Sequence, residues 1–247
     1  MVPLKSEKDL QMLRVSGHIL AQVLQKLRES VKAGISTLEI DWLAQELIEK
    51  EKAIPAFKGY RGYPANICTS VNDEIVHGIP SERKLKEGDI ISLDIGINYQ
   101  GFFSDAAVTV AVGKTVPQAK KLIEVTRCAL SEGIKRVQAG NRLSDISYAV
   151  QTYVERYGFS VVREFVGHGI GKSLHEDPEI PNFGFPGRGP QLKSGMVFAI
   201  EPMVNAGTWR SRIMDNQWTA VTADGSLSAH FEHTVAVTDD GPEILTR

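Results

Sequence analysis

An acidic motif occurs twice in this chain, and each copy ends an apolar run in a carboxylate. One copy begins Lys-x-Gly at Lys86 and ends at Asp94, and the other begins in the same way at Lys193 and ends at Glu201. A carboxylate in a buried strand is costly unless it is paired or binds a metal. A chain that repeats this motif must fold so that both acids reach such a partner.

Other segments repeat in the same order. They are Asp105-Ala-Ala-Val and Glu232-His-Thr-Val, His77-Gly-Ile and His168-Gly-Ile, and Val31-Lys-Ala-Gly34 and Val137-Gln-Ala-Gly140. The repeat predicts a single domain made of two related halves, near 1–113 and 114–247, packed about a pseudo-twofold axis. Ligands from the two halves would meet at their junction, where binding sites commonly form.

Length, charge and cysteine content exclude several classes of protein. The chain has 247 residues, a net charge of −2 and two cysteines, Cys68 and Cys128. The low net charge argues against nucleic-acid binding, and two cysteines provide neither a disulfide framework nor a Cys-x-x-Cys zinc site. Because the N-terminus lacks an apolar signal core and no run of roughly 18 apolar residues occurs, we expect a cytoplasmic protein without a membrane segment.

Hydrophobic periodicity predicts an α+β fold in which helices cover an antiparallel sheet. Ser6, Ser36 and Ser144 are expected helix caps, and Pro117 is an expected first helical residue. The predicted helices span 6–29, 36–52, 117–137 and 144–157, the predicted strands span 66–76, 89–98, 104–112, 159–166, 196–204 and 231–238, and 181–190 is a predicted surface loop.

The strand period places the acids on one face of the sheet. Asp94 shares its face with Ser92 and Gly96, whereas the alternate positions are apolar and face the core. A hairpin that turns at Tyr99-Gln100 would place Asp94 opposite Asp105 at roughly 5 Å, where like charges repel. A cation between the two carboxylates would convert this repulsion into binding. The alternative is that all four acids lie on ordinary solvent-facing strands.

The donor types indicate which metal site these acids could form. Four carboxylates and the imidazole of His168 are hard to borderline donors, and four negative charges balance two divalent ions. The sequence lacks the His-Glu-x-x-His helix of common zinc proteases. Two ions roughly 3.5–4 Å apart can share a water, lower its pKa and polarise a carbonyl, which is hydrolytic chemistry.

The remaining histidines divide into three groups. His77 and His175 lie beside flexible glycines and could donate a hydrogen bond to a substrate carbonyl or tetrahedral intermediate, although either could be structural. His230 and His233 flank Glu232 and are expected to support it. His18 lies on a helix, where a plain surface or packing role is expected.

At these residues the chain resembles the type I methionine aminopeptidases over essentially its whole length. The motifs are Gly59-Tyr60-Arg-Gly62-Tyr63-Pro, Cys68, Asn72-Asp-Glu-Ile-Val-His77-Gly-Ile-Pro80, Leu93-Asp94-Ile-Gly96, Gly167-His168-Gly-Ile-Gly171, His175-Glu176, Ile200-Glu201-Pro202-Met203 and Phe231-Glu232-His233-Thr234. The resemblance implies the pita-bread fold, a pseudo-twofold architecture that agrees with the internal repeat.

The resemblance also implies a role for each site residue. The implied metal ligands are Asp94, Asp105, His168, Glu201 and Glu232. Asp105 and Glu232 would bridge two ions, and Glu201 would carry a proton from the bridging water. His77 and His175 would contact the substrate.

A methionine pocket follows from the same resemblance. It would be formed by Phe57, Tyr60, Tyr63, Cys68, Leu174 and Trp218. Apolar, aromatic and sulfur surfaces suit a thioether. Many relatives have Cys where Phe57 stands and Phe where Leu174 stands. Taken alone, such aromatic residues would more often belong to the core.

The implied activity is removal of the initiator methionine from nascent chains whose second residue is small. The chain has neither a long insertion between His168 and Glu232, which marks type II, nor a cysteine-rich N-terminal extension. A compact bacterial or organellar type I enzyme is therefore expected. Its expected partners are the N-terminal methionine of nascent polypeptides and the ribosome, and we expect it to be a monomer.

Two alternative functions fit part of the pattern. Prolidases and aminopeptidases P share the fold and the ligand set, but they usually add an N-terminal domain. A non-catalytic binding module on the same fold would tend to lose metal ligands, whereas all five are present here. Cobalt, manganese, iron and zinc all tolerate this ligand set, so the sequence leaves the metal open.

Overall fold

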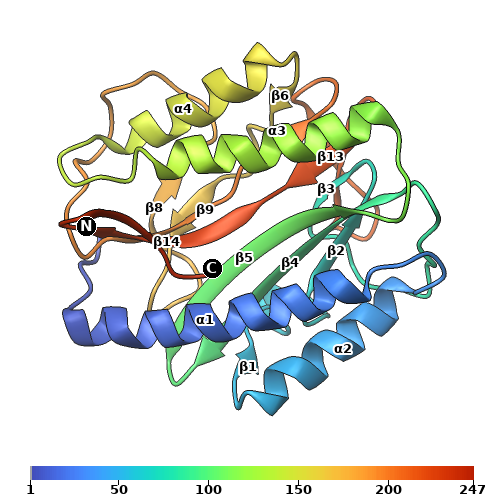
Figure 1. The fold of residues 1–247 in the computed structure, drawn as a ribbon, viewed down its shortest axis with the longest axis horizontal. Coiled ribbons are helices and arrows are strands. Elements are labelled where there is room, and N and C mark those ends of the chain that lie inside the picture. The colour runs from blue at the N-terminus through green and yellow to red at the C-terminus, as the bar shows by residue number, and fades with distance from the viewer. Residues whose placement is uncertain (1) are drawn as a thin grey trace.

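The computed structural model describes residues 2–247 as one α+β unit with four helices (Figure 1). The helices are α1 (Glu7–Ser30), α2 (Thr37–Lys50), α3 (Pro117–Ile134) and α4 (Leu143–Arg156). All four predicted helices are confirmed. Ser6 and Ser36 cap α1 and α2, and each exchanges hydrogen bonds with the acid three residues later. None of the helices in residues 2–247 has the length and hydropathy needed to cross a membrane.

A nine-stranded antiparallel sheet forms the centre of the molecule. The order along its main path is β1-β4-β5-β14-β9-β7-β8, with β2 paired to β4 and β15 paired to β14. Its strands are β1 (Ile54–Pro55), β2 (Cys68–Val71), β4 (Ile90–Tyr99), β5 (Phe102–Ala111), β7 (Gly167–Gly169), β8 (Glu176–Ile180), β9 (Val197–Ile200), β14 (Glu232–Thr238) and β15 (Gly241–Ile244). The β5–β14 pair, which carries Asp105 and Glu232, therefore lies between β4 and β9, the strands of the two acidic motifs.

Two three-stranded sheets and a short 3-10 helix complete the fold. They comprise β6 (Ser160–Val161), β10 (Met203–Asn205) and β13 (Ser228–His230), then β3 (Glu74–Val76), β11 (Ser211–Ile213) and β12 (Ala220–Thr222), and η1 (Tyr60–Gly62). The division into halves near residue 113 stays a prediction.

The helices pack against one face of the large sheet and leave the acids on the other. Helices α3 and α4 lie along the upper part of the sheet in Figure 1, and α1 and α2 lie along its lower part. Ile91, Leu93 and Ile95 of β4 pack with α1 and α2, and Phe198 of β9 packs with α3 and α4. Burial of each such side chain contributes roughly 1.5–3 kcal/mol. Because side chains alternate along a strand, Asp94 points away from the helices.

The predicted register of the β4–β5 hairpin is wrong by one residue at the turn. Asp94 lies opposite Ala107, and Asp105 lies opposite Gly96. The turn residues are Gln100 and Gly101, with φ of +52° and +86°, because a two-residue type I′ turn needs positive φ at both places. Asp94 and Asp105 therefore stay on one face but are diagonal neighbours.

The match of His77 to His168 is also wrong. His168 lies on β7, opposite Ala199 of β9. In the first half, β2 pairs with β4 as β7 pairs with β9, and Ser70 lies opposite Ser92 at the corresponding rung. His77 instead follows β3, which belongs to a three-stranded sheet. The two His-Gly-Ile segments are therefore similar in sequence but do not occupy equivalent positions in the fold.

Several boundaries differ from prediction for local reasons. Ser144 does not cap α4: the helix begins at Leu143, and the carboxylate of Asp145 accepts from the backbone N–H of Arg142 at 2.8 Å. Ser144 exchanges hydrogen bonds with Arg188 in the 181–190 loop, whose prediction is confirmed. The predicted strand 159–166 is reduced to Ser160–Val161. The predicted strands 66–76 and 196–204 are each interrupted.

Candidate metal centre and substrate pocket

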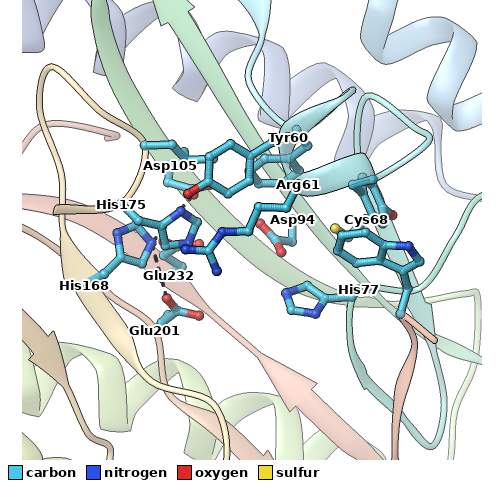
Figure 2. A pocket seen from close by; sticks show the side chains of 14 residues that line it. Tyr60, Arg61, Cys68, His77, Asp94, Asp105, His168, His175, Glu201 and Glu232 are labelled. Carbon is cyan, nitrogen blue, oxygen red and sulfur yellow. Dashed lines mark ion pairs between the residues drawn. The ribbon is translucent and has the colours of Figure 1, made fainter. Parts of the chain in front are cut away.

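One pocket contains every site residue that the sequence suggested (Figure 2). It is lined by Phe57, Tyr60, Arg61, Tyr63, Cys68, His77, Asp94, Asp105, His168, Leu174, His175, Glu201, Trp218 and Glu232. Residues that are far apart in the sequence thus meet on the helix-free face of the sheet. Their individual roles stay predictions.

The acidic end of the pocket holds a compact group of potential ligands. Ligand atoms of Asp105, His168 and Glu232 all lie within 4.8 Å of one another. The Nε2 atom of His168 is 3.6 Å from Oε1 of Glu201 and 4.0 Å from Oδ2 of Asp105. Asp94 lines the same pocket from β4. Five potential ligands therefore converge, two from the acidic motifs and three from other segments of the chain.

Strand pairing explains why these side chains meet. Glu232 of β14 lies opposite Ala107 of β5, two residues from Asp105. The Thr234 hydroxyl accepts from the backbone N–H of Asp105 at 2.9 Å and donates to its carbonyl at 2.8 Å. The Nδ1 atom of His168 lies 2.9 Å from the Gly169 carbonyl. A proton on Nδ1 satisfies that carbonyl and leaves the Nε2 lone pair toward the acids.

Burial makes the charged form of these carboxylates unfavourable in the protein alone. Burial raises the pKa of Asp94 and of Glu201 to about 7, although a nearby histidine opposes the rise in each case. For Asp105 and Glu232, burial and neighbouring acids raise the pKa well above the usual range. Oε1 of Glu232 has no hydrogen-bond partner among residues 2–247. Crowded, buried and partly unpartnered carboxylates fit divalent cations, which would compensate their charge.

Two histidines flank the acidic group. The His175 ring stacks on Tyr60 at 5.2 Å between centroids and lies 4.1 Å from the His168 ring. His77 packs edge-on against Phe165 and Trp218. Burial lowers the pKa of His77 to about 4 and is the main cause that lowers the pKa of His175 to about 3. Both imidazoles are therefore neutral at pH 7, and each can donate one N–H.

The other three histidines differ in their surroundings. His230 is buried, and its Nε2 lies 3.5 Å from Oε2 of Glu201, so it lies beside that acid. His233 does not line the pocket: its Nδ1 lies 2.9 Å from the hydroxyl of Thr246. Support of Glu232 by His233, expected from their adjacency, is not seen, because neighbouring residues on a strand face opposite ways. His18 pairs with Gln22 on an exposed helix face.

The apolar end of the pocket is small and largely aromatic. Phe57, Tyr63, Cys68 and Leu174 are buried in one cluster, with Trp218 packed against it. Tyr63 meets Trp218 edge-on at 5.2 Å, and its hydroxyl donates to backbone carbonyls. Burial raises the pKa of the Cys68 thiol, so it stays uncharged. The whole pocket, with its acidic end included, has a volume of about 150 Å³.

The sequence reasoning missed one lining residue, Arg61. This exposed residue lies in η1 with a φ of +49°, and its guanidinium lies 5.4 Å from the centroid of the Tyr60 ring. Its position within the Gly59-to-Tyr63 motif was the available signal. That motif was interpreted only through its aromatic residues.

Comparisons with known proteins agree on the family of this chain. The model of metallopeptidase family M24 matches residues 11–239. A methionine aminopeptidase from Clostridium perfringens is 54% identical, covering 100% of this chain and 99% of that protein. The crystal structure of methionine aminopeptidase from Rickettsia prowazekii is 42% identical, with a TM-score of 0.99 and full coverage of both chains.

A prolidase structure shows the same fold at greater distance. The prolidase from Pyrococcus horikoshii OT3 is 21% identical with a TM-score of 0.81, and the match covers 99% of this chain but 63% of that one. This likeness concerns the fold alone. The family match at residues 11–239 includes every residue that lines the pocket.

Proposed function

The chain belongs to metallopeptidase family M24 and, within it, to the methionine aminopeptidases, and from this membership we propose how its pocket removes an N-terminal methionine. The enzyme is a metal-dependent aminopeptidase. One observation carries the proposal: four carboxylates, three of them buried and that of Glu201 partly exposed, and a buried imidazole adjoin a small apolar region of the same pocket. The carboxylates and the imidazole suit cations, and the apolar part of the pocket suits one apolar side chain of a substrate.

Two divalent ions would be held by Asp94, Asp105, His168, Glu201 and Glu232, which all line the pocket. Four carboxylates balance the charge of two such ions, and cobalt, manganese, iron or zinc would each suit the donors. When bound, the ions supply an electrophile for the scissile carbonyl oxygen and lower the pKa of the attacking water. The protein supplies the remaining steps.

Proton transfer is assigned to Glu201. Its carboxylate lies at the acidic end of the pocket between His168 and His230, 3.6 Å and 3.5 Å from their Nε2 atoms. We assign to it the proton of the attacking water, which it then delivers to the nitrogen of the leaving peptide. A carboxylate in this role must take up and release a proton near neutral pH, and burial favours that behaviour.

His77 and His175 are assigned to the carbonyl group under attack. Both rings line the pocket and are neutral at pH 7, so each offers an N–H without introducing a charge. Such donors stabilise an oxyanion best where water is excluded. His175, which lies against His168, would act close to the ions.

The apolar cavity would hold the methionine side chain. Phe57, Tyr63, Cys68 and Trp218 present aromatic and sulfur surfaces that suit a thioether. A free α-amine would lie at the metal end of the pocket. The whole pocket, with its acidic end included, measures about 150 Å³, and this small volume favours peptides whose second residue is also small.

The cellular setting is the finer part of the proposal. The enzyme is proposed to act as a monomer. Cys68 and Cys128 are free thiols, which is consistent with a reducing cytoplasm. The substrates would be nascent polypeptides, so the ribosome is the proposed site of action.

Peptide cleavage tests the proposed function. We expect Met-Ala and Met-Gly peptides to lose their methionine, and N-acetylated versions of the same peptides to be stable, because the blocked amine cannot enter the metal end. Mass spectrometry of the products distinguishes the two. Comparable turnover of the acetylated peptide would show that the enzyme is not an exopeptidase.

A further inference from the structure

The segment that carries His175 into the pocket is held by a carboxylate. Residues 170–175 connect β7 to β8, and 171–175 form bends rather than regular structure. Glu176, the first residue of β8, accepts at Oε1 from the backbone N–H groups of Lys172 at 2.8 Å and Ser173 at 3.2 Å. Because Glu176 follows His175 directly, these hydrogen bonds fold the segment back on the residue that presents the imidazole.

The same carboxylate is anchored to the N-terminal segment of the chain. Lys5 Nζ donates to Oε2 of Glu176 at 2.5 Å, and the two side chains are 6% and 12% exposed. Lys5 is itself fixed, because its backbone N–H donates to the Gly195 carbonyl at 2.7 Å. A Cβ added at Gly171 would overlap the side chain of Lys5, so the lysine stem packs directly on the segment.

Contacts with the first half fix the other side of the segment. The backbone N–H of Phe103 donates to the Gly171 carbonyl at 2.7 Å, and Lys172 Nζ lies 3.1 Å from Asp9. His175 then stacks between Tyr60 and His168. Hydrogen bonds, an ion pair and ring contacts thus act together on five residues that have no regular structure of their own.

We propose that Lys5 and Glu176 are positioning residues that hold His175 in its catalytic orientation. The inference rests on the role of His175 proposed above. Neither side chain lines the pocket, so the pair acts only through the 171–175 segment. The pair is desolvated, and loss of one partner leaves a buried charge that would rearrange the segment. A displacement of about 1 Å at a catalytic group can cost on the order of 100-fold in rate.

Lys5→Met is the test variant, because methionine keeps the stem but removes the charge. Arg14→Met is the matched control. Arg14 also joins the N-terminal region to the second half, through two hydrogen bonds of 2.8 and 2.9 Å to Glu243, but it contacts no residue of the 171–175 segment. Lys5→Arg serves as the conservative variant, and Glu176→Gln tests the same pair if Lys5→Met folds poorly.

Steady-state kinetics on a Met-Ala peptide should separate positioning from general stability. We expect Lys5→Met to lower kcat about 10- to 100-fold with KM changed less than about threefold, and Lys5→Arg to recover part of the loss. Arg14→Met should keep wild-type kcat. In a His175→Ala background, Lys5→Met should change kcat by less than about twofold, because the group it positions is gone.

Amide exchange supplies a measurement that does not depend on turnover. In Lys5→Met, the N–H groups of Lys172 and Ser173 should exchange faster than in wild type, and in Arg14→Met they should not. Normal kcat in Lys5→Met, or an equal loss of kcat with and without His175, would overturn the proposal. If wild type cleaved no Met-Ala peptide, the proposed function would fail, and unchanged exchange at Lys172 and Ser173 would separately refute the positioning.

Discussion

The two acidic strand pairs supply the site in different ways. In the first half, the two-residue turn of β4–β5 places Asp105 opposite Gly96, so Asp94 and Asp105 are offset along the ladder. In the second half, β9 and β14 are separated by β10 to β13, and Glu201 and Glu232 each lie one residue beyond the last paired rung, Ile200–His233. Similar ladders therefore present their acids with different registers, and the two ends of the site are unlike.

The strands beside these pairs increase the difference. Strand β2 sets Cys68 opposite Asp94, whereas β7 sets His168 beside β9, near Glu201. The Asp94 end thus adjoins the apolar pocket, and the Glu201 end adjoins the imidazoles. This arrangement would separate recognition of the substrate side chain from the proton transfer that we propose for Glu201.

The largest expected effect concerns the two acids that join the halves. Asp105→Asn and Glu232→Gln each remove a negative charge from the proposed ligand set, and we expect both to lose metal together with roughly 10³-fold in kcat/KM. Asp224→Asn, the same chemical change in an exposed loop, is the control. Metal analysis and kinetics on the same preparations measure both quantities. Two retained metals and a full rate in both variants would mean that the site is wrongly placed.

A second comparison uses the histidines, one from each half. His175→Ala should lower kcat by roughly 10²-fold, the effect of losing one donor to a developing oxyanion. Metal binding should persist, since His175 is not a proposed ligand. His77→Ala tests whether removal of the N–H donor of His77 lowers kcat as much as removal of that of His175. A destabilised His175→Ala protein with normal kcat would assign that histidine a structural role only.

A third test exchanges side-chain volume between Phe57 and Leu174, which come from different halves of the sequence. Phe57 and Leu174 lie in one apolar cluster of the pocket. Phe57→Cys should leave a cavity and Leu174→Phe should overfill the space, and each should cost about tenfold in kcat/KM. The double variant should return to within about threefold of wild type, because the two volumes compensate. Independent, additive losses would show that the two residues do not share a subsite.

A smaller effect concerns the stability of the metal-free protein. Burial raises the folded-state pKa of Asp94 from 3.8 to about 7, so the folded form holds this proton to higher pH than the unfolded form. The stability that Asp94 contributes is therefore complete below pH 3.8 and is lost as pH rises toward about 7. Asp94→Asn lacks this dependence.

Thermal unfolding of chelated protein at pH 5 and pH 7 measures the difference. The Tm of Asp94→Asn relative to wild type should rise by several degrees between these two pH values. A change of about 1 kcal/mol in the free energy of unfolding shifts the Tm of a chain of this size by about 2–4 °C. Use of a Tm difference cancels the opposite contribution of the buried histidines, whose pKa values are lowered. A constant Tm difference would place Asp94 in a more polar environment than the structure gives it.

Local sequence signals predicted the elements better than their relative positions. Ser6 and Ser36 were identifiable as caps because an acidic residue follows each of them three positions later. In the structure each serine exchanges hydrogen bonds with that acid. The faces of β4 and β5 were also correct, because the actual hairpin differs from the expected one by an even shift in pairing. The register itself depends on positive φ at Gln100, which a sequence containing Tyr-Gln-Gly does not determine.

The site was predictable because its residues lie in motifs, whereas the arrangement around it was not. All thirteen proposed site residues line one pocket. The predicted equivalence of His77 and His168 is wrong because it was based on a match of three residues, His-Gly-Ile. Strand pairing shows that Ser70 occupies the position that corresponds to His168. Arg61 lies within a motif, but its place in the pocket depends on the backbone of η1, and the pairing of Lys5 with Glu176 is marked by no local pattern.

Metal titration of wild-type protein tests the central claim most directly, since the claim is that two unlike halves meet on two ions. Protein purified without added metal and treated with chelator should bind two divalent ions per chain, and cleavage of a Met-Ala peptide should return as the ions bind. Calorimetry with parallel kinetics measures both. Full activity in the metal-free protein, or activity restored with no bound ion, would contradict the account.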